Sequence, residues 1–199
     1  MRPIRRLVRA LGRRLRPRPG APQLRLRLEP ERAPQPVAPP TGCDLRRFAP
    51  GDEGDWLDLL DDGGELGPWT RQRLASEALA YLVPGTQWFV WCGPVLAAGA
   101  GVYERSPAGW EVGWVATRPE YRRRGLGRCA LTAAALSALS LPRRPVWLFT
   151  DDHRDAAMRL YLRAGFEPDA HHPSHPKRWR AVLIRLGPEF AGYLDALQL

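Results

Sequence analysis

The sequence contains a single lysine, Lys177, only three cysteines, and no apolar run close to the ~20 residues that a membrane-spanning helix needs. Cys43, Cys92 and Cys129 are far apart, odd in number and without C-x-x-C spacing, so we expect neither a disulfide framework nor a zinc site. The opening segment also lacks the uninterrupted apolar stretch of a secretory signal. Together these absences predict a protein of the reducing cytoplasm.

Positive charge is concentrated at one end of the chain. The formal net charge is +9, and residues 1–40 hold 11 Arg against 2 Glu. Residues 41–199 hold 19 basic and 19 acidic side chains. The remainder of the chain therefore has no overall charge, and composition does not indicate a globular nucleic-acid-binding domain.

The first forty residues differ in texture from the rest. In residues 1–16 the apolar side chains fall on one helical face, with Arg on the others. Such a segment can bind an anionic membrane or nucleic acid, and the alternatives are a disordered tail without such a partner or a wrongly chosen start codon. Residues 17–40 carry eight Pro and are expected to form an extended linker. We therefore predict a basic Arg/Pro-rich tail or linker over 1–40, with an amphipathic helix as an option over 2–16, and one folded domain over 41–199.

Strand and helix patterns alternate along the predicted domain. Strands are expected at residues 45–48, 87–92, 95–103, 110–117, 146–150 and 180–186. Helices are expected at residues 51–60, 70–82, 125–139 and 154–164, and Pro188 begins a C-terminal helix. This order predicts an α/β domain with a mixed sheet and helices on both faces.

One segment combines the features of an anion site. A strand is followed by a Pro-containing turn and by Arg122-x-x-Gly125-x-Gly127, which opens a helix. Glycines let the backbone approach a ligand, the first N–H groups of a helix are unpaired, and arginines suit phosphate, so a pyrophosphate fits here. An ordinary helix start with solvated arginines is the simplest alternative. A dinucleotide fingerprint also matches, but there the strand should run directly into the first Gly, and here residues 119–124 intervene.

Two motifs together resemble a known family. Arg122-x-x-Gly125-x-Gly127 after strand-Pro-Glu-Tyr resembles the acetyl-CoA signature of the GNAT family of N-acetyltransferases. Ala157-x-x-Leu-Tyr161-x-x-x-Gly-Phe166-x-Pro resembles the second signature of that family. The resemblance covers about residues 44–186. It implies a central mixed, mostly antiparallel sheet of six to seven strands, with a splay between the fourth and fifth strands of the family and helices on both faces.

The resemblance also implies how the co-substrate acetyl-CoA would bind, without a metal. Its pantetheine arm would insert between the splayed strands, and its pyrophosphate would lie at the helix mouth. In many members an Asn stands where this chain has Arg154, which could reach a phosphate instead. The cofactor-binding residues implied in this way are Val115, Ala116, Thr117, Arg122, Arg123, Arg124, Gly125, Leu126, Gly127, Arg128 and Arg154.

Catalytic roles can be assigned by the same resemblance. Tyr161 stands where members often place the residue that protonates the leaving thiolate, although it also lies on the apolar face of its helix. Glu111 resembles a strand carboxylate that draws the amine proton through water, and the alternative is an exposed strand-edge side chain. Asp151 and Asp152 are rival bases, but Asp152 fits a helix N-cap better.

Other features bear on the acceptor amine. His171, His172 and His175 lie in a Pro-broken stretch that predicts an acceptor-side loop, with Trp179 packing beneath, rather than a metal site. The carboxylates in residues 61–65 could attract a cationic amine. The sequence does not identify the acceptor, and the family often forms homodimers.

The leading hypothesis is transfer of an acetyl or short acyl group to a primary amine by direct attack in a ternary complex. The alternative is a non-catalytic CoA-binding module docked on membrane or nucleic acid through its tail, and a dinucleotide-binding protein is a weaker third.

Overall fold

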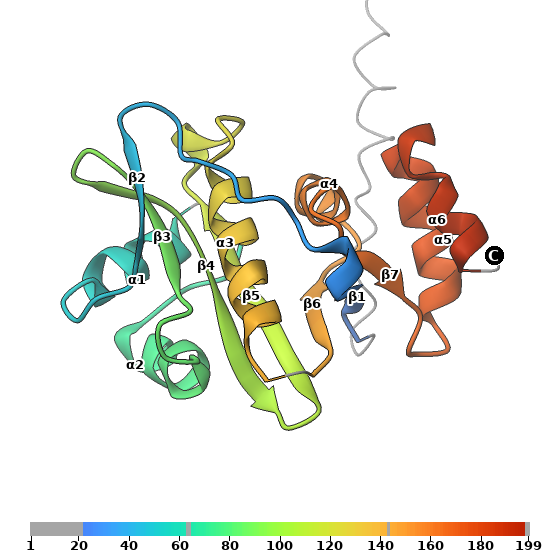
Figure 1. Ribbon diagram of the computed structural model, residues 1–199, viewed down its shortest axis with the longest axis horizontal. Coiled ribbons are helices and arrows are strands. Elements are labelled where there is room, and N and C mark those ends of the chain that lie inside the picture. The colour runs from blue at the N-terminus through green and yellow to red at the C-terminus, as the bar shows by residue number, and fades with distance from the viewer. Residues whose placement is uncertain (1–21, 63–64, 143, 198–199) are drawn as a thin grey trace, which may run out of the picture.

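A single seven-stranded sheet runs through the computed structural model, which describes residues 22–62, 65–142 and 144–197 (Figure 1). The amphipathic segment predicted over residues 1–16, for which contact with a membrane or nucleic acid was considered, lies outside the described residues. The strand order is β2-β3-β4-β5-β6-β1-β7, and every neighbouring pair is antiparallel except β5 and β6. The strands are β1 (Leu24–Leu28), β2 (Cys43–Arg47), β3 (Trp88–Cys92), β4 (Val95–Ser106), β5 (Gly109–Thr117), β6 (Val146–Thr150) and β7 (Glu167–Asp169).

Helices cover both faces of this sheet. They are α1 (Glu53–Asp61), α2 (Arg71–Arg73), α3 (Leu126–Ser140), α4 (Asp155–Arg163), α5 (His175–Leu186) and α6 (Gly192–Ala196). Helix α2 continues through a π-helical turn (Leu74–Ala78) and a 3₁₀ turn (Leu79–Tyr81), and shorter 3₁₀ turns are Pro30–Arg32, Pro119–Tyr121 and Pro188–Phe190. The predicted mixed, mostly antiparallel sheet with helices on both faces is confirmed.

Two apolar clusters bind the helices to the sheet. The larger one joins α3, α4 and α5 to one face, and Figure 1 shows α3 lying across the strands on that side. Small side chains at Ala130, Ala134 and Ala138 bring α3 close to the strands. The smaller cluster packs α1 and the α2 segment against the other face, around Trp56 and Tyr103. The sheet is thus buried on both sides, which gives its central strands nearly continuous apolar sequences.

Strand β1 corrects the predicted domain boundary. Its residues pair with β6 on one side and with β7 on the other. Leu24, Leu26 and Leu28 are at most 1% exposed. Alternation of Leu with Arg is the pattern of a strand with one buried face, but the surrounding Pro residues hid it. The prediction of a linker over 17–40 is therefore wrong for Leu24–Leu28, and the folded domain begins before residue 41.

Residues 180–186 form the second half of α5, so the strand predicted there is wrong. The buried positions Trp179, Val182, Leu183 and Leu186 have the i, i+3, i+4, i+7 spacing of a helix face. The apolar run Val182–Ile184, which contains two β-branched residues, suggested a strand, but Ile184 is 60% exposed and lies on the outer side of the helix. The helical period therefore prevails over local β propensity.

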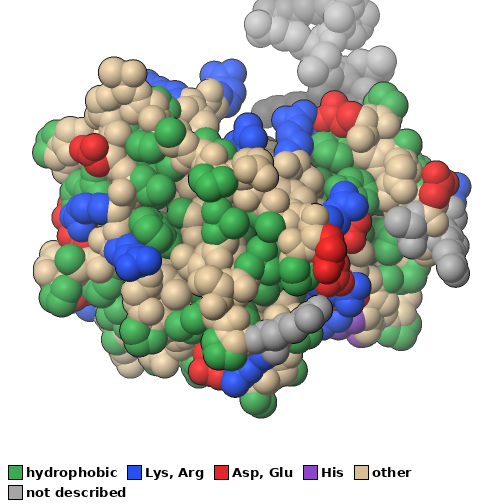
Figure 2. All heavy atoms as spheres, viewed as in Figure 1, with side chains coloured by type: hydrophobic (Ala, Val, Ile, Leu, Met, Phe, Trp, Pro, Cys, Tyr) green, Lys and Arg blue, Asp and Glu red, His purple; other side chains and the backbone are tan. Residues whose placement is uncertain are grey.

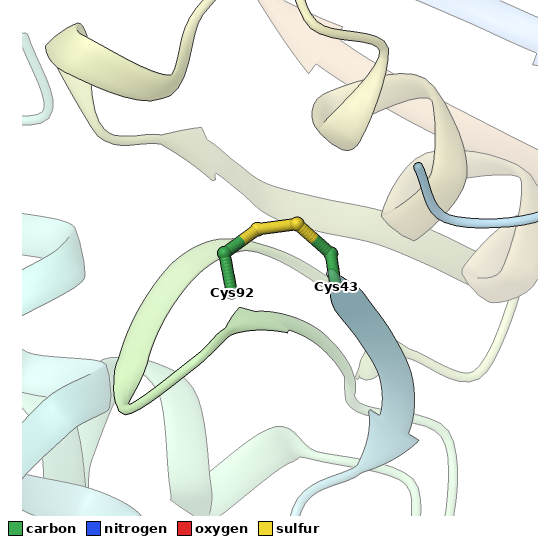
Figure 3. The surroundings of a disulfide bond; sticks show 2 residues. All are labelled: Cys43 and Cys92. Atoms are coloured by element: carbon green, nitrogen blue, oxygen red, sulfur yellow. A yellow bond between two sulfur atoms is a disulfide. The ribbon is translucent and has the colours of Figure 1, made fainter. Parts of the chain in front are cut away.

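A disulfide links Cys43 to Cys92, which corrects the expectation of three unpaired thiols (Figure 3). The two residues face each other across β2 and β3, with their Cα atoms 4.1 Å apart and 49 positions apart in sequence. The pairing of β2 with β3 brings the two cysteines together, and their spacing in the sequence did not predict this disulfide. The bond also removes the cysteine argument for a reducing compartment. Cys129 is a buried free thiol that donates to the Val37 carbonyl at 3.1 Å.

The segment between β1 and β2 crosses the outside of α3 (Figure 1). Beside it, Pro36, Val37, Leu45 and Trp88 line a shallow apolar hollow of about 320 Å³ with one side of α3. Figure 2 shows hydrophobic side chains gathered over this side of the molecule. No helix in the described part of the chain combines the length and the apolar character needed to cross a bilayer.

Candidate active site

Strands β5 and β6 part in the middle of the sheet. They pair at Trp110↔Val146 and at Glu111↔Trp147, and among the described residues no further pair joins them, although β5 continues to Thr117. This is the predicted splay. Beyond Glu111 the β6-facing side of the β5 backbone has no strand partner, so its polar groups are available to an extended ligand. Val115, Ala116 and Thr117, the residues predicted to hold pantetheine, all lie on this stretch.

A β-bulge distorts β5 at the same place. Gly99 faces Ala116 and Gly101 faces Gly113, so the single residue between the two glycines opposes both Trp114 and Val115. Trp114 adopts a left-handed backbone with φ of 46°, which is uncommon for any residue other than Gly. A bulge bends its strand and redirects the neighbouring groups. Here it redirects the backbone of Trp114 and Val115 within the splay, and Ala116 returns to register with Gly99.

The helix mouth after β5 has the geometry of an anion cradle. Arg123 and Gly125 both have positive φ, at 62° and 83°, and Gly125 is the N-cap of α3. Within the described part of the chain, no acceptor is bonded to the backbone N–H groups of residues 123–128. Successive unpaired N–H groups in a turn that mixes left- and right-handed residues form an anion-binding concavity. The geometry therefore agrees with the anion site that the sequence predicted.

The residues around the helix mouth differ in exposure: those against the core are apolar or glycine, and the arginines face solvent. Leu126 is 1% exposed and packs in the core, so only its backbone faces the mouth. A Cβ on Gly127 would lie 2.7 Å from Thr117 Oγ1, so a glycine is needed for α3 to approach the end of β5. The predicted phosphate-binding arginines Arg122, Arg123, Arg124 and Arg128 are exposed around this mouth.

Glu65, in the connection between α1 and α2, ties two of the predicted phosphate-binding arginines together. Arg122 Nη1 lies 2.9 Å from its carboxylate Oε1, and Arg154 Nη2 donates to its backbone carbonyl at 2.7 Å. Arg154 also pairs with Asp151 at 3.1 Å. A phosphate entering the mouth would compete with Glu65 for Arg122, since both are anions.

Replacing Glu65 by glutamine should therefore tighten binding of CoA. The Arg122–Glu65 pair is exposed, and such pairs contribute about 0.2–1 kcal/mol, which corresponds to up to roughly fivefold in Kd. Calorimetry with CoA at low and high salt measures the change. Glu104→Gln is the matched control, because Glu104 also forms an exposed ion pair, with Arg144 at 2.6 Å, but on β4 rather than at the helix mouth. Equal Kd changes in both variants would show that only net charge matters.

Tyr161 lies on the inner face of α4. Its ring belongs to the larger apolar cluster and the residue is 6% exposed. The structure therefore gives it the packing role. Burial raises the pKa of Tyr161 to about 12, with Arg154 opposing the shift and Asp151 adding to it. The phenol is thus protonated at neutral pH and able to donate a hydrogen bond.

Glu111 is the last β5 residue paired with β6, so its carboxylate belongs to the start of the splay. The side chain is 19% exposed, which contradicts the alternative of an exposed strand-edge carboxylate. Burial raises the pKa of Glu111 above its usual range, and Arg105 at 3.4 Å opposes that shift. A carboxylate with these features suits a base that must lose and regain a proton near neutral pH.

The two aspartates after β6 are engaged in structural contacts. Asp152 accepts two hydrogen bonds from Arg178, at 2.9 and 2.5 Å. The N-cap of α4 is Arg154, so the prediction that Asp152 caps this helix is wrong. Asp151 pairs with Arg154 and accepts from Gln23 at 3.2 Å. Their arginine partners make both of them poor candidates for the base.

The carboxylates between α1 and α2 are likewise occupied. Asp61 accepts a hydrogen bond from the Trp69 backbone at 2.8 Å, and Asp62 pairs with Arg118 at 2.9 Å. With Glu65 bound to Arg122, this loop presents paired rather than free negative charge. The structure thus lends no support to the hypothesis that it attracts cationic amines.

The histidine-rich stretch packs around one buried ring. His175 is 0% exposed and begins α5, with the ring centroids of His171 and His172 at 4.4 and 5.4 Å from its own. The expected loop therefore ends at His175, and Trp179 is buried beneath it as predicted. Burial lowers the pKa of His171 and His175. In the described residues, no group of three or more His, Cys, Asp or Glu side chains is arranged to hold a metal.

Sequence reasoning missed Arg105, and it assigned Glu65 to the acceptor amine rather than to Arg122. Arg105 could have been found from the hairpin, because a turn between Ser106 and Gly109 sets Tyr103 opposite Glu111 and leaves Arg105 on the same face as Tyr103. Glu65 gave no comparable signal, since its contacts join segments 57 and 89 positions apart.

Comparisons with known proteins agree with this geometry. The model of the acetyltransferase (GNAT) family matches residues 55–166. A mycothiol acetyltransferase from Thermobispora bispora is 37% identical in an alignment 147 residues long that covers 64% of this chain and 47% of the relative. The chain thus spans about half the length of that relative.

Solved structures show the same fold. A GNAT-family protein from Novosphingobium aromaticivorans superposes with a TM-score of 0.53 at 26% identity, covering 75% of this chain and 60% of the other. The ribosomal-protein-S18-alanine N-acetyltransferase of Escherichia coli gives a TM-score of 0.52 at 21% identity, covering 62% and 76%. With the splay, the bulge and the cradle, these matches establish that the chain belongs to the GNAT family of acetyltransferases.

Proposed function

We propose that this protein transfers an acetyl or related short acyl group from acetyl-CoA to a primary amine, by direct attack within a ternary complex. The observation that carries the proposal is the continuity of three features along one short segment: a splayed strand, a bulge and a mouth of unpaired N–H groups. The first accommodates an extended arm, and the last accommodates a pyrophosphate.

The backbone of β5 would hold the acyl group. In this proposal Val115, Ala116 and Thr117 bind the pantetheine arm through their main-chain groups. An N–H of Val115 or Ala116 would polarise the thioester carbonyl; Val115 lies within the bulge and has no register partner of its own on β4, whereas Ala116 pairs with Gly99. Residues 122–128 hold the pyrophosphate, and Arg154 reaches a phosphate after it leaves Glu65.

Glu111 and Tyr161 would handle the protons. The amine nitrogen attacks the carbonyl carbon, and Glu111 accepts the proton that the nitrogen gives up, through a water molecule. The C–S bond then breaks, and the Tyr161 hydroxyl donates a hydrogen bond to the departing sulfur. A pKa of about 12 lies above the ~8.5 of an ordinary thiol. We therefore infer that the Tyr161 hydroxyl first stabilises the thiolate by a hydrogen bond, and that the sulfur takes up its proton as CoA leaves.

The test combines a binding and a turnover measurement on the full chain. Calorimetry measures binding of acetyl-CoA and CoA, and a thiol reagent measures CoA release with a panel of small amines, peptides and protein N-termini. A mycothiol-related amine belongs in the panel, since that compound is named in the T. bispora relative. We expect micromolar binding and thiol release that depends on one class of amine. Absence of binding overturns the proposal, and binding without amine-dependent release indicates a non-catalytic CoA-binding module.

A further inference from the structure

Arg105 lies in an aromatic cage at the end of β4. Its guanidinium carbon is 5.5 Å from the ring centroid of Tyr81, 5.4 Å from that of Tyr103 and 5.1 Å from that of Trp114. Its Nη2 also donates to the Glu77 carbonyl at 2.7 Å. Cation–π contacts with three rings and a carbonyl bond restrict this side chain far more than a surface arginine.

The caged cation faces the Glu111 carboxylate. Tyr103 and Glu111 are register partners on β4 and β5, and Arg105 Nε lies 3.4 Å from Glu111 Oε1. A Cβ added to Gly113 would lie 3.2 Å from that same oxygen. The carboxylate therefore leans along β5 over Gly113, toward the bulge at Trp114 where the acyl carbonyl is proposed to be polarised.

We propose that Arg105 is a positioning residue for acyl transfer, which fixes the Glu111 carboxylate at the start of the splay and keeps it ionised at neutral pH. The inference rests on the proposed function, in which Glu111 is the base. The cage supplies the rigidity, because three rings and the Glu77 carbonyl contact the guanidinium at once. Trp114 belongs to both the cage and the bulge, so one residue links the base to the acyl-binding backbone.

The charges around Glu111 leave Arg105 as its principal partner. Arg105 lies on β4. The same strand contributes the buried phenol of Tyr103, whose hydroxyl donates to Gln87 Oε1 at 2.7 Å. The helical segment on this face brings Glu77, whose carboxylate pairs with Arg73 at 3.1 Å. That pair is internally neutral. Burial raises the pKa of Glu111 and Arg105 lowers it, so removing the cation leaves burial unopposed.

The experiment is the pH dependence of kcat/KM for acetyl transfer to the amine identified above. A base must be ionised to act, so activity falls as pH drops through its pKa. In Arg105→Gln we expect the acid limb to move about one pH unit upward, with up to roughly a tenfold loss on the acid side of the limb and recovery at higher pH. Arg105→Lys keeps the charge without the planar contacts and should move the limb less.

Arg144→Gln is the matched control. Arg144 also lies over a tryptophan, 4.5 Å from the Trp110 ring centroid, and pairs with a carboxylate, Glu104, away from the splay. Its pH profile should equal that of the wild type. Thermal melting of each variant checks folding, and Arg105→Lys provides a second variant if Arg105→Gln does not fold.

The outcomes separate this inference from the proposed function. If Glu111→Gln removes the acid limb and Arg105→Gln leaves it in place, Glu111 is the base but Arg105 does not position it. An equal loss at every pH in Arg105→Gln also overturns the inference, because it indicates a structural role alone. If Glu111→Gln keeps the wild-type limb, the base of the proposed function is wrong and this inference fails with it.

Discussion

A chain that begins at residue 34 is expected not to fold, whereas one that begins at residue 22 is expected to fold and turn over. The first lacks β1, which fills the position between β6 and β7 in the sheet. Leu24, Leu26 and Leu28 are completely buried there. Full burial of a leucine contributes about 1.5–3 kcal/mol, so three approach the 5–15 kcal/mol by which a domain is typically stable. Loss of β1 also leaves two strands with unpaired backbone groups.

Circular dichroism and urea unfolding of the two truncated chains measure this difference. Leu26→Asp in the full-length chain is a second test, since it places a charge opposite Leu148 without shortening the protein. A cooperative transition of wild-type midpoint in the chain from residue 34 would refute the role of β1. The chain from residue 22 also examines the tail. If it loses turnover while remaining folded, the tail contributes more than docking; if turnover is kept, catalysis is independent of it.

Tyr161→Phe should lower kcat about a hundredfold and leave the Kd of acetyl-CoA unchanged. A positioned proton or hydrogen-bond donor contributes roughly 10²–10⁴ to a rate, and phenylalanine keeps the ring that packs in the core. Stability should hold, because the apolar contacts of the ring are unchanged. Single-turnover kinetics with the identified amine, beside calorimetry, separates chemistry from binding.

Tyr193→Phe is the control for this experiment. Tyr193 packs against the same apolar cluster, and its hydroxyl donates to the Leu162 carbonyl of α4 at 3.4 Å. The substitution thus removes a phenol near α4 but outside the splay, and kcat should be unaffected. A kcat for Tyr161→Phe within twofold of the wild type would leave Tyr161 with its packing role only.

Most elements followed from local sequence patterns. Short apolar runs located the strands β2 to β6, and period-3.6 alternation located the helices α1, α3 and α4, within a few residues. The strands of the middle of the sheet are covered on both faces and each helix buries one face, so the order of apolar side chains reflects both. The cradle was predictable for a related reason, since local spacing places the glycines at the first turn of a helix, where the N–H groups are unpaired.

The predictions were wrong where another sequence feature outweighed the periodicity of the apolar residues. Proline around β1 indicated a linker, although the Leu-Arg alternation fits a strand, and the β-branched residues of α5 indicated a strand, although its buried positions have a helical period. In both cases the decisive term is burial against a partner. For Leu24–Leu28 that partner is β6, far along the chain, and for α5 it is the apolar cluster to which α4 also contributes.

By itself the sequence determined the family and its two motifs, because short-range spacing decides where a strand ends, where a helix begins and which backbone groups remain unpaired. Only the tertiary structure decided the Cys43–Cys92 bond, the contact of Glu65 with Arg122 and the cage that holds Arg105 beside Glu111. Each of these joins different secondary-structure elements through the register and packing of the sheet. Contacts of that kind depend on the whole fold, and no local pattern encodes them.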